Sequence, residues 1–438
     1  MMDLRQSRHC AGAGSFSSGR ATAWELQSSG FGSILPQVRC ARTNASSLRS
    51  PESCAPGNIA LRESEGRAKK MKKLPPPLDL KRVKVYPLEQ RLSESNLADI
   101  LIDPDAPAAA LPENLLLAVK DSARKIASAH QRRATVMLMY GAHLIKNGGA
   151  RIMNRLIELG WVTHLGTNGA GTIHDWEFSF LGRSTESVKK NVLTGTFGTW
   201  DETGRSIHLA LLAGALRGEG YGGSLGRFII EDGVTLPSIE SLEEALRAAP
   251  SHPNAPACAD LLQAMVTHHL PAGRIEVKHP WKESSVLGTA FRRGVPLTVH
   301  PGIGYDIIAN HPMFNGAAIG RAAEMDFRLL GTAVDHLQNG VVLSVGSAIM
   351  APQVFEKSVS CVNNLRLQEN RGIVRGHTIY VVDIQDGGNW DWTQGEPPKD
   401  NPAYYLRFCK SFSRMGGAMH YLQCDNVAYL HNLYHLLK

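Results

Sequence analysis

The 438 residues are enough for one large α/β domain or two ordinary ones, and 43% hydrophobic with 20% charged residues is the composition of a soluble globular protein. No apolar run approaches the roughly 18 residues of a membrane span, so the sequence excludes a membrane protein. The net charge of +7 comes from residues 1–73, which hold 12 Lys and Arg against 5 Asp and Glu, whereas residues 74–438 hold 35 of each. A neutral body also excludes an extended basic surface for nucleic acid.

The cysteines are seven, an odd number, and form no C-x-x-C pair. Neither a structural zinc site nor a disulfide framework is therefore indicated. Reduced thiols point to the cytoplasm as the location of the protein. Three of the seven fall in the N-terminal segment, and the full set is Cys10, Cys40, Cys54, Cys258, Cys361, Cys409 and Cys424.

Residues 1–73 are rich in Ser, Gly, Ala and Arg and show no sustained periodicity, which predicts a disordered tail. The same acid-poor composition is typical of an organellar transit peptide. A third interpretation is an over-extended reading frame, because Met71 followed by KKLPPP resembles a natural start. We favour the third and expect a single α/β domain over residues 74–438.

The first half of that domain alternates helical and strand-like patterns after an extended lead-in over residues 75–87. In chain order we expect helix 93–102, a linker over 103–112, helix 115–130, strand 134–140, a helix from 141 to about 159, strand 161–165 and helix 173–181. Helix 206–216 then leads into a glycine-rich segment, 218–226, which we interpret as a mobile loop. Helices 238–248 and 256–269 follow.

The second half keeps the same rhythm. We expect helix 284–293, strand 295–300, helix 317–337, strand 341–345, helix 352–366, strand 378–383, helix 402–414, strand 418–423 and helix 426–437. Strands that alternate with helices predict a doubly wound, Rossmann-like α/β fold whose mostly parallel sheet is covered on both faces. Ligands of such sheets bind beyond the carboxyl ends of the strands, which here are residues 141–149, 166–171, 301–306, 346–347 and 384–391.

Residues 161–182 are the most informative of these strand ends. An apolar strand leads into the glycine-rich turn 167–171 and then into a helix that carries His174, Asp175 and Glu177 near its start. A strand, a glycine turn and a helix N-terminus form a favourable site for an anion or a nucleotide. The three side chains could hold a cationic substrate or move a proton. The alternative is structural, since acidic groups in a first helical turn also stabilise the helix dipole.

Two further patterns are weaker. His300, Asp306 and His311 have the spacing H-x5-D-x4-H, which matches no helical pair of metal ligands, so we predict no metal site. Trp390 and Trp392 could wall a ligand pocket or equally anchor their own loop.

Several strand ends together resemble the deoxyhypusine synthase family over roughly residues 134–414. The matching features are NGGAR at 147–151, TNGA at 167–170 leading into IHD at 173–175, His300-Pro301 with Asp306, Gly346-Ser347, Asp386-Gly387 and a lysine at 410. GTNGAGTIHDWE and GSAIMAPQVFEK are similar to a bacterial branch of that family. The resemblance implies a Rossmann-like fold, NAD as the cofactor and a homotetramer.

The resemblance also implies roles for individual residues. The residues that match the family's NAD contacts are Asn147, Gly148, Gly149, Thr167, Asn168, Gly169, Asp306, Gly346 and Ser347. By the same match Lys410 forms an imine with the substrate, His174 and Asp175 are catalytic, and the substrate contacts are Glu177, His300 and Asp386. From the residues alone, Lys410 could equally be a solvated helix lysine.

The sequence departs from the family at three places. Phe408-Cys409-Lys410 replaces the family's W-G-K, Tyr404 stands where a glutamate is expected, and Ala351-Pro352-Gln353 replaces a histidine. The leading hypothesis is an NAD-dependent, cytoplasmic transferase that acts on a polyamine such as spermidine through an enzyme-lysine imine, with either a protein lysine or a small amine as the acceptor. The alternatives are a homospermidine synthase-type enzyme, which needs no protein acceptor, and a non-catalytic NAD-binding protein.

Overall fold

The computed structural model describes residues 74–346 and 349–438. Its central feature is a six-stranded sheet in the order β10-β9-β8-β2-β3-β7, in which every neighbouring pair is parallel. The strands are β2 (Val136–Tyr140), β3 (His164–Thr167), β7 (Leu297–Val299), β8 (Val341–Val345), β9 (Thr378–Asp383) and β10 (Ala418–Gln423). The chain builds outward from β2 to β7, returns to β8, and builds outward again to β10. This order confirms the doubly wound fold and creates a topological switch point between β2 and β8.

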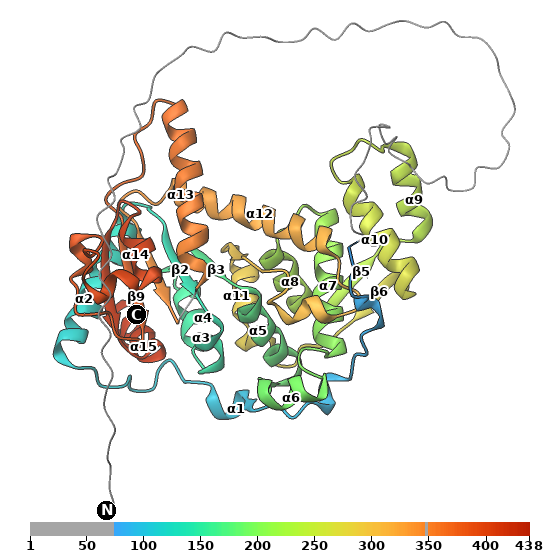
Figure 1. Cartoon of the computed structure of the whole chain (residues 1–438), viewed down its shortest axis with the longest axis horizontal. Helices are drawn as coiled ribbons and strands as arrows, with labels where there is room; N and C mark the ends of the chain where they lie inside the picture. Colours follow the sequence, from blue (N-terminus) through green and yellow to red (C-terminus); the bar gives the residue numbers. More distant parts are fainter. Residues whose placement is uncertain (1–73, 347–348) are drawn as a thin grey trace, which may run out of the picture. The chain divides into compact units, whose positions relative to one another are not determined.

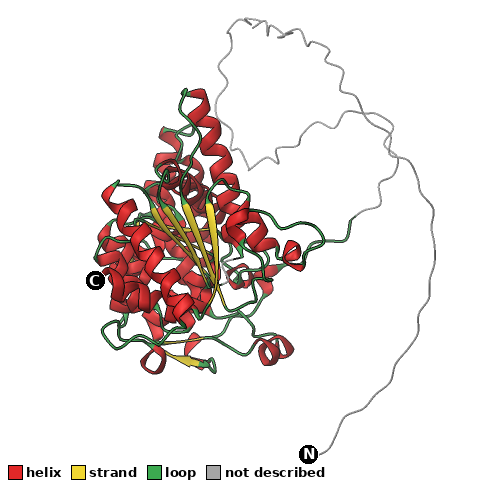
Figure 2. Ribbon diagram, turned by 90° about the vertical axis from the view of Figure 1, so that its left-hand side faces the viewer, coloured by secondary structure: helices red, strands yellow, loops and turns green. Residues whose placement is uncertain are grey.

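The strands form where the sequence is apolar in short runs. All five residues of β2 and all five of β8 are buried, as expected for parallel strands covered on both faces. Because side chains alternate along a strand, Leu138 and Tyr140 enter one core while Met137 and Met139 enter the other. Figure 2 shows the strands enclosed by helices on both sides.

The first core lies under α2 (Glu113–Gln131), α4 (Ala150–Glu158) and α15 (Asn426–Leu437). The second lies under α13 (Met350–Gln368), α14 (Arg407–Ser413) and the end of α12 (Gly316–Asp335). Two short helices flank the lead-in and β2, namely α1 (Leu97–Ile100) and α3 (Ala142–Lys146). The 3-10 helices η1 to η6 are Leu80–Arg82, Leu88–Gln90, Lys282–Ser284, Ile307–Asn310, Trp392–Gln394 and Pro402–Tyr405.

A long insertion separates β3 from β7 and carries most of the remaining helices. It contains α5 (Gly169–Leu181), β4 (Arg183–Ser184), α6 (Val188–Thr194), α7 (Asp201–Leu216), α8 (Tyr221–Ile230), β5 (Gly233–Leu236), α9 (Ile239–Ala248), α10 (Ala255–His268), β6 (Gly273–Glu276) and α11 (Val286–Arg293). β5 pairs antiparallel with β6, and β4 pairs antiparallel with β1 (Ser95–Asn96) of the lead-in. In Figure 1, α9 and α10 lie at the side of this body opposite α14 and α15.

The glycine-rich segment 218–226 is the main error of the predicted elements. Most of it belongs to the buried helix α8, not to a mobile loop. Its glycines allow backbone contact, since a Cβ on Gly222 would collide with the Leu297 carbonyl and one on Gly226 would approach the Leu287 carbonyl. Asp326 of α12 accepts the N–H of Gly222 at 3.1 Å at the start of α8. Tight packing, not flexibility, therefore explains these glycines.

The helix expected over 141–159 is two helices, α3 and α4. Gly148 separates them with φ at +82°, a conformation that only glycine adopts easily. A Cβ at Gly148 would also collide with the carbonyl oxygen of Ile100 in the lead-in. The break between α3 and α4 thus lets the lead-in pack against the start of α4 at Gly148.

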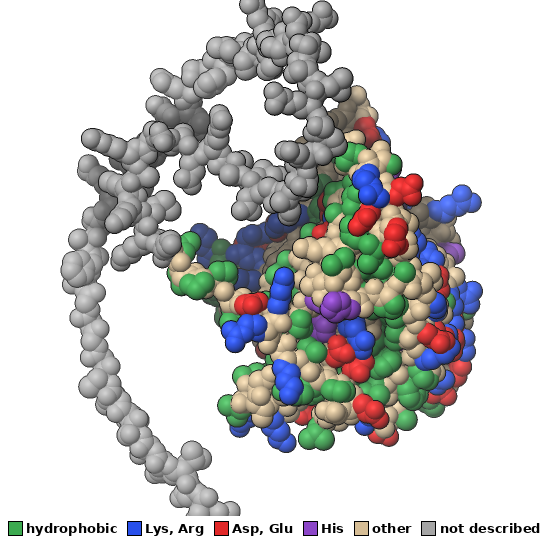
Figure 3. Space-filling model, turned by 90° about the vertical axis from the view of Figure 1, so that its right-hand side faces the viewer, with side chains coloured by type: hydrophobic (Ala, Val, Ile, Leu, Met, Phe, Trp, Pro, Cys, Tyr) green, Lys and Arg blue, Asp and Glu red, His purple; other side chains and the backbone are tan. Residues whose placement is uncertain are grey.

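Residues Pro75–Lys438 form one compact unit. Basic and acidic side chains are interspersed over the face shown in Figure 3, in keeping with equal numbers of each in residues 74–438. Within the described ranges, no helix combines the length and apolar character needed to cross a membrane. The three interpretations of residues 1–73, and the predicted contact at Ser347, fall outside the described residues.

Candidate functional site

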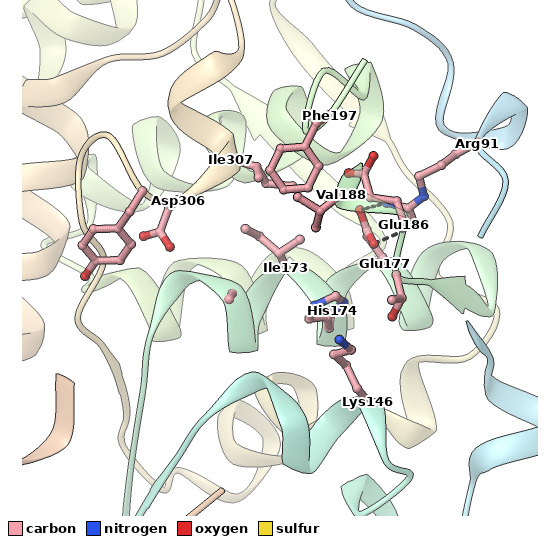
Figure 4. Close-up of a pocket in the computed structure, with 13 residues that line it drawn as sticks. Arg91, Lys146, Ile173, His174, Glu177, Glu186, Val188, Phe197, Asp306 and Ile307 are labelled. Atoms are coloured by element: carbon pink, nitrogen blue, oxygen red, sulfur yellow. Dashed lines mark hydrogen bonds and ion pairs between the residues drawn. The ribbon is translucent and has the colours of Figure 1, made fainter. Parts of the chain in front are cut away.

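A pocket of about 220 Å³ lies over α5, at the carboxyl ends of β3 and β7 (Figure 4). One face of α5 forms its floor, because Ala170, Ile173, His174 and Glu177 have the i, i+3, i+4, i+7 spacing that places them in a row. The lining is completed by Arg91, Lys146, Thr185, Glu186, Val188, Phe197, Tyr305, Asp306 and Ile307. Of the predicted residues, the structure therefore brings His174, Glu177 and Asp306 together.

Glu177 is a fully buried charged side chain of the pocket with several hydrogen-bond partners. Arg91 donates from Nη1 and Nη2 to its two carboxylate oxygens, each at 2.8 Å, and both side chains are almost fully buried. The Thr203 hydroxyl donates to Oε1 at 2.8 Å. Burial alone would raise the pKa of Glu177, but the attraction of Arg91 outweighs it and holds the pKa below its usual range. Glu177 is thus an ionised carboxylate inside the protein.

His174 is linked to this carboxylate through Ser184. The Ser184 hydroxyl donates to Glu177 Oε2 at 2.5 Å and lies 2.7 Å from His174 Nδ1. Because the serine proton is already donated to the carboxylate, Nδ1 must carry the proton of this hydrogen bond, which leaves the Nε2 lone pair free. Burial lowers the pKa of His174 to about 4, Glu177 opposes that shift, and Lys146 adds to it. At neutral pH the ring is therefore an uncharged base.

Lys146 comes from the last turn of α3 and lies beside His174 (Figure 4). It makes no hydrogen bond or ion pair with any residue of the described ranges. Glu186, by contrast, is held by three neutral donors: Trp200 Nε1 at 3.0 Å, Asn191 Nδ2 at 2.5 Å and the Gly198 N–H at 3.2 Å. Of the two cationic side chains that line the pocket, Lys146 is the one without a partner among the described residues.

Asp306 lies at the other end of the pocket floor. It is 5% exposed, accepts the N–H of Gly302 at 2.8 Å, and packs so closely on Gly169 that a Cβ there would collide with its carboxylate. Burial raises the pKa of Asp306 to about 6, although the Gly302 donor lowers it. No cationic side chain of the described residues lies within ion-pair distance of it.

The neighbouring predicted residues hold the architecture. Asp175 accepts the Ser285 hydroxyl at 2.7 Å and the N–H groups of Val286 and Leu287 at 2.9 and 3.0 Å, so it caps the N-terminus of α11. Asn168 caps α5 by accepting the N–H of Gly171 at 2.9 Å. Thr167 is fully buried and donates to the Tyr140 carbonyl at 2.9 Å. None of the three reaches the pocket lining.

The remaining predicted cofactor contacts lie elsewhere. Asn147 lines a separate hollow next to α15, while Gly148 and Gly149 pack against Ile100 and Leu144. Gly346 follows β8 with φ at +81°, and a Cβ there would lie 3.7 Å from Leu144 Cβ and from Asn426 Nδ2. Gly346 thus sits at the switch point of the sheet, where doubly wound folds bind their ligands.

His300 and Asp386 do not line the pocket either. His300 is 7% exposed, with Nε2 3.2 Å from the Thr298 hydroxyl, and burial lowers its pKa to about 4. Asp386 is exposed and accepts the N–H of Gly388 at 2.9 Å within its own loop. Both contacts are structural.

Lys410 is not placed as an imine-forming lysine. Its Nζ lies 3.1 Å from Glu396 Oε1 and over the ring of Tyr404. Partial burial lowers its pKa, but Tyr404 and Glu396 outweigh that effect and the net shift is upward. A protonated, ion-paired amine cannot attack a carbonyl or imine carbon. Lys410 is also absent from the pocket lining.

Sequence reasoning missed four residues of the site: Arg91, Lys146, Ser184 and Glu186. Arg91 lies 86 residues before its partner, and nothing in the local pattern links the two. Lys146 could have been selected from the sequence, because it lies in the strand-end segment 141–149 that follows β2, next to the predicted contacts Gly148 and Gly149. Ser184 and Glu186 lie just beyond the helix whose acidic residues we did select.

No family model and no curated protein matches the chain. Matching solved structures include the ternary complex of AgrE with ornithine and NAD+ (TM-score 0.37, 14% identity, 75% of this chain and 34% of that one). Others are ArgZ, an arginine dihydrolase of cyanobacteria (0.34, 12%, 74% and 32%), and a conserved LOR/SDH protein from Methanococcus maripaludis S2 (0.35, 12%, 81% and 74%). The chain spans about a third of the length of the first two.

These neighbours are arginine- and ornithine-related or LOR/SDH proteins, not deoxyhypusine synthases. The predicted membership of the deoxyhypusine synthase family is therefore wrong, and so is the function drawn from it, a transferase acting on spermidine or another polyamine. The chemical reason is that Lys410 is ion-paired with Glu396 and therefore cannot form the imine that the predicted transferase reaction requires. NAD, the predicted cofactor, is bound in one of these neighbours.

Proposed function

We propose that the chain is an NAD-dependent enzyme in which His174 takes a proton from a small substrate bound over α5. The observation that carries this proposal is the chain Glu177–Ser184–His174, which leaves Nε2 as a free base in a residue that lines the pocket. Removal of a proton from a hydroxyl or amino group is what must accompany loss of hydride from the carbon next to it.

The switch point offers features that suit NAD. Asn426 is 6% exposed, yet its Oδ1 has no hydrogen-bond partner among the described residues. Its Nδ2 lies against Gly346, whose missing side chain keeps the space open. Among the described residues no side chain caps helix α13, which follows and begins at Met350, and uncapped N–H groups attract a phosphate. We propose that Gly346, Asn426 and the first turn of α13 hold NAD, which supplies a hydride acceptor when bound.

Helix α3 connects this switch point to the pocket. Leu144 lies against Gly346, and Lys146, two residues later, lines the pocket. Two residues of an α-helix advance roughly 3 Å along its axis but turn about 200° around it, so Leu144 and Lys146 project from different sides of α3. A cofactor at the switch point and a substrate over α5 would therefore contact the same short helix.

The residues around the base have separate tasks. When Nε2 takes a proton, the imidazolium stays hydrogen-bonded through Nδ1 to Ser184, and the Glu177 carboxylate stabilises the new charge. Arg91 holds that carboxylate in place with two hydrogen bonds. The apolar side chains of Ile173, Val188 and Phe197 limit the water around the base.

The test separates cofactor binding from catalysis. The full chain is titrated with NAD by calorimetry and then assayed for NADH at 340 nm with a panel of hydroxy acids and amino acids. We expect Asn426→Ala to weaken NAD binding, and His174→Gln to keep NAD binding while losing about 10²- to 10⁴-fold in turnover. His252→Gln, at an exposed position, is the matched control. A wild-type chain that binds no NAD would refute the proposal.

A further inference from the structure

The charges that line the pocket are not equally satisfied. Arg91 and Glu177 neutralise each other, and Glu186 is held by three neutral N–H donors. Lys146 and Asp306 have no oppositely charged partner in the part of the chain that the structure describes. A buried or half-buried charge without a partner is costly, so both groups favour a ligand that brings one.

These two groups lie toward opposite ends of the pocket. In Figure 4, Asp306 is on one side and Lys146, next to His174, on the other, with Ile173 between them. The space between is lined by the apolar side chains of Ile173, Val188, Phe197 and Ile307. An acidic end, an aliphatic middle and a basic end are complementary to one molecule with an ammonium group at one end and a carboxylate at the other.

We infer that the substrate is a small aliphatic amino acid whose carboxylate binds Lys146, whose reacting hydroxyl or amino group lies beside that carboxylate within reach of His174, and whose ammonium group, at the far end of its alkyl chain, binds Asp306. This inference rests on the proposed function in that it takes the pocket over α5 as the substrate site. It also excludes dicarboxylates, because the pocket lining carries two cationic and three acidic side chains, and a second carboxylate would face Asp306 or Glu186.

The experiment measures binding without cofactor, so that it does not depend on turnover. The full chain is titrated by calorimetry with 5-aminopentanoate, pentanoate, pentylamine and glutarate, and the series is repeated with 4-aminobutanoate and 6-aminohexanoate to cover the length of the pocket. We expect the best amino acid to bind about 10- to 100-fold more tightly than pentanoate or pentylamine, since each of these loses one charged contact. Glutarate should bind weakest.

Variants assign each end. Lys146→Met should bind amino acid and amine alike, because the carboxylate contact is gone, while still preferring both over pentanoate. Asp306→Asn should bind amino acid and pentanoate alike. Lys189→Met and Asp400→Asn, both exposed and outside the pocket lining, should keep the wild-type order.

Two results would overturn the inference. One is a wild-type chain that binds pentanoate or pentylamine as tightly as every amino acid of the series. The other is a uniform loss of all ligands in Lys146→Met with the thermal unfolding midpoint unchanged. The proposed function is judged separately: amino acid binding without NAD binding would refute the redox proposal and leave this inference standing, whereas NAD binding without amino acid selectivity would do the reverse.

Discussion

Two arginine–glutamate pairs, each with two hydrogen bonds, lie in different parts of the molecule. Arg91 donates two hydrogen bonds of 2.8 Å to Glu177, and Arg414 donates two hydrogen bonds of 2.7 and 2.6 Å to Glu396. The first pair is almost completely buried, whereas the side chains of the second are 53% and 32% exposed. The first orients a serine and a histidine of a pocket, and Glu396 of the second also pairs with the partly buried Lys410.

The difference shows that proximity of charged residues to strand ends does not by itself make a site. In the loops near β9 and β10 the polar groups satisfy one another, as Asp386 does with its own loop and Glu396 with Lys410 and Arg414. Over α5, Lys146 and Asp306 are left without counter-charges in the described chain. Charges without a counter-charge among the described residues, not polar groups as such, distinguish the pocket from these loops.

The largest expected effect comes from breaking the buried pair. Glu177→Ala leaves Arg91 charged and without its partner in the interior, and we expect the free energy of unfolding to fall by about 3–5 kcal/mol. The matched change Glu396→Ala removes a surface partner and should shift the unfolding curve far less. Urea unfolding of both variants measures the contrast. Equal destabilisation by the two changes would mean that burial does not separate these pairs.

If Glu177→Ala does not fold, the double variant Arg91→Met with Glu177→Met keeps the test possible. Replacing both charges removes the uncompensated ion, so the double variant should unfold at a higher urea concentration than either single variant. A double variant less stable than both singles would contradict the role assigned to the pair.

The next effect is a pH dependence at the far end of the pocket. The pKa of Asp306 is about 6 in the folded protein and 3.8 for an ordinary aspartate, so the folded state binds this proton more tightly. Stability from protonated Asp306 is therefore full below about pH 4 and lost as pH rises through about 6. The difference in unfolding free energy between wild type and Asp306→Asn should change by up to about 3 kcal/mol over that window.

Asp326 titrates with the same sign, because burial raises its pKa to about 7. It is present in both proteins, so its contribution cancels in the difference. A difference that stays constant between pH 4 and pH 6 would show that Asp306 is not desolvated. Urea titrations at half-unit intervals of pH are sufficient to decide.

A smaller effect is expected from the middle of the proton chain. Ser184→Ala removes the hydrogen bond that fixes the His174 tautomer, and we expect turnover in the proposed reaction to fall about 10- to 100-fold with NAD binding unchanged. Ser184→Thr keeps the hydroxyl and should retain more activity. The rate should also fall below about pH 4 in the wild type, where His174 is protonated. An unchanged rate in Ser184→Ala would remove Ser184 from the chain.

The smallest effect is predicted for the residues outside the pocket. Lys410→Met and Asp386→Asn alter contacts outside the pocket, so neither should change turnover or NAD binding, and the unfolding midpoint should move least in this set. A large loss of turnover in Lys410→Met would mean that the region around Glu396 and Lys410, and not the pocket over α5, holds the functional site.

Much of the fold was predictable because its strands and helices follow local patterns of apolar residues. The strands 341–345, 378–383 and 418–423 and the helix 426–437 were predicted at their observed bounds. Each is a short run of apolar, often β-branched residues or a helical repeat that ends at a clear signal. Helix α8 failed because its glycines look like loop residues until the backbones that they contact, at Leu287 and Leu297, are known.

The site was harder to predict, since its decisive contacts join distant residues. His174, Glu177 and Asp306 were selected because they follow strands. Whether a carboxylate caps a helix, as Asp175 does, or faces a cavity depends on partners 110 to 112 residues away. The tryptophans illustrate the same limit: Trp390 and Trp392 donate to the carbonyls of Gly395 and Gly387 and so anchor their loop.

The position of Arg91 has a consequence for how the protein folds. The lead-in that carries it adds no strand to the main sheet and docks on the insertion instead, where the Tyr86 N–H donates to Thr199 O and the Glu94 N–H to Thr185 O. The sheet can therefore form before this segment arrives. Until it does, Glu177 lacks its counter-charge, so we expect closure of the pocket to be coupled to docking of the lead-in. A late refolding phase that disappears in Arg91→Met would be its signature.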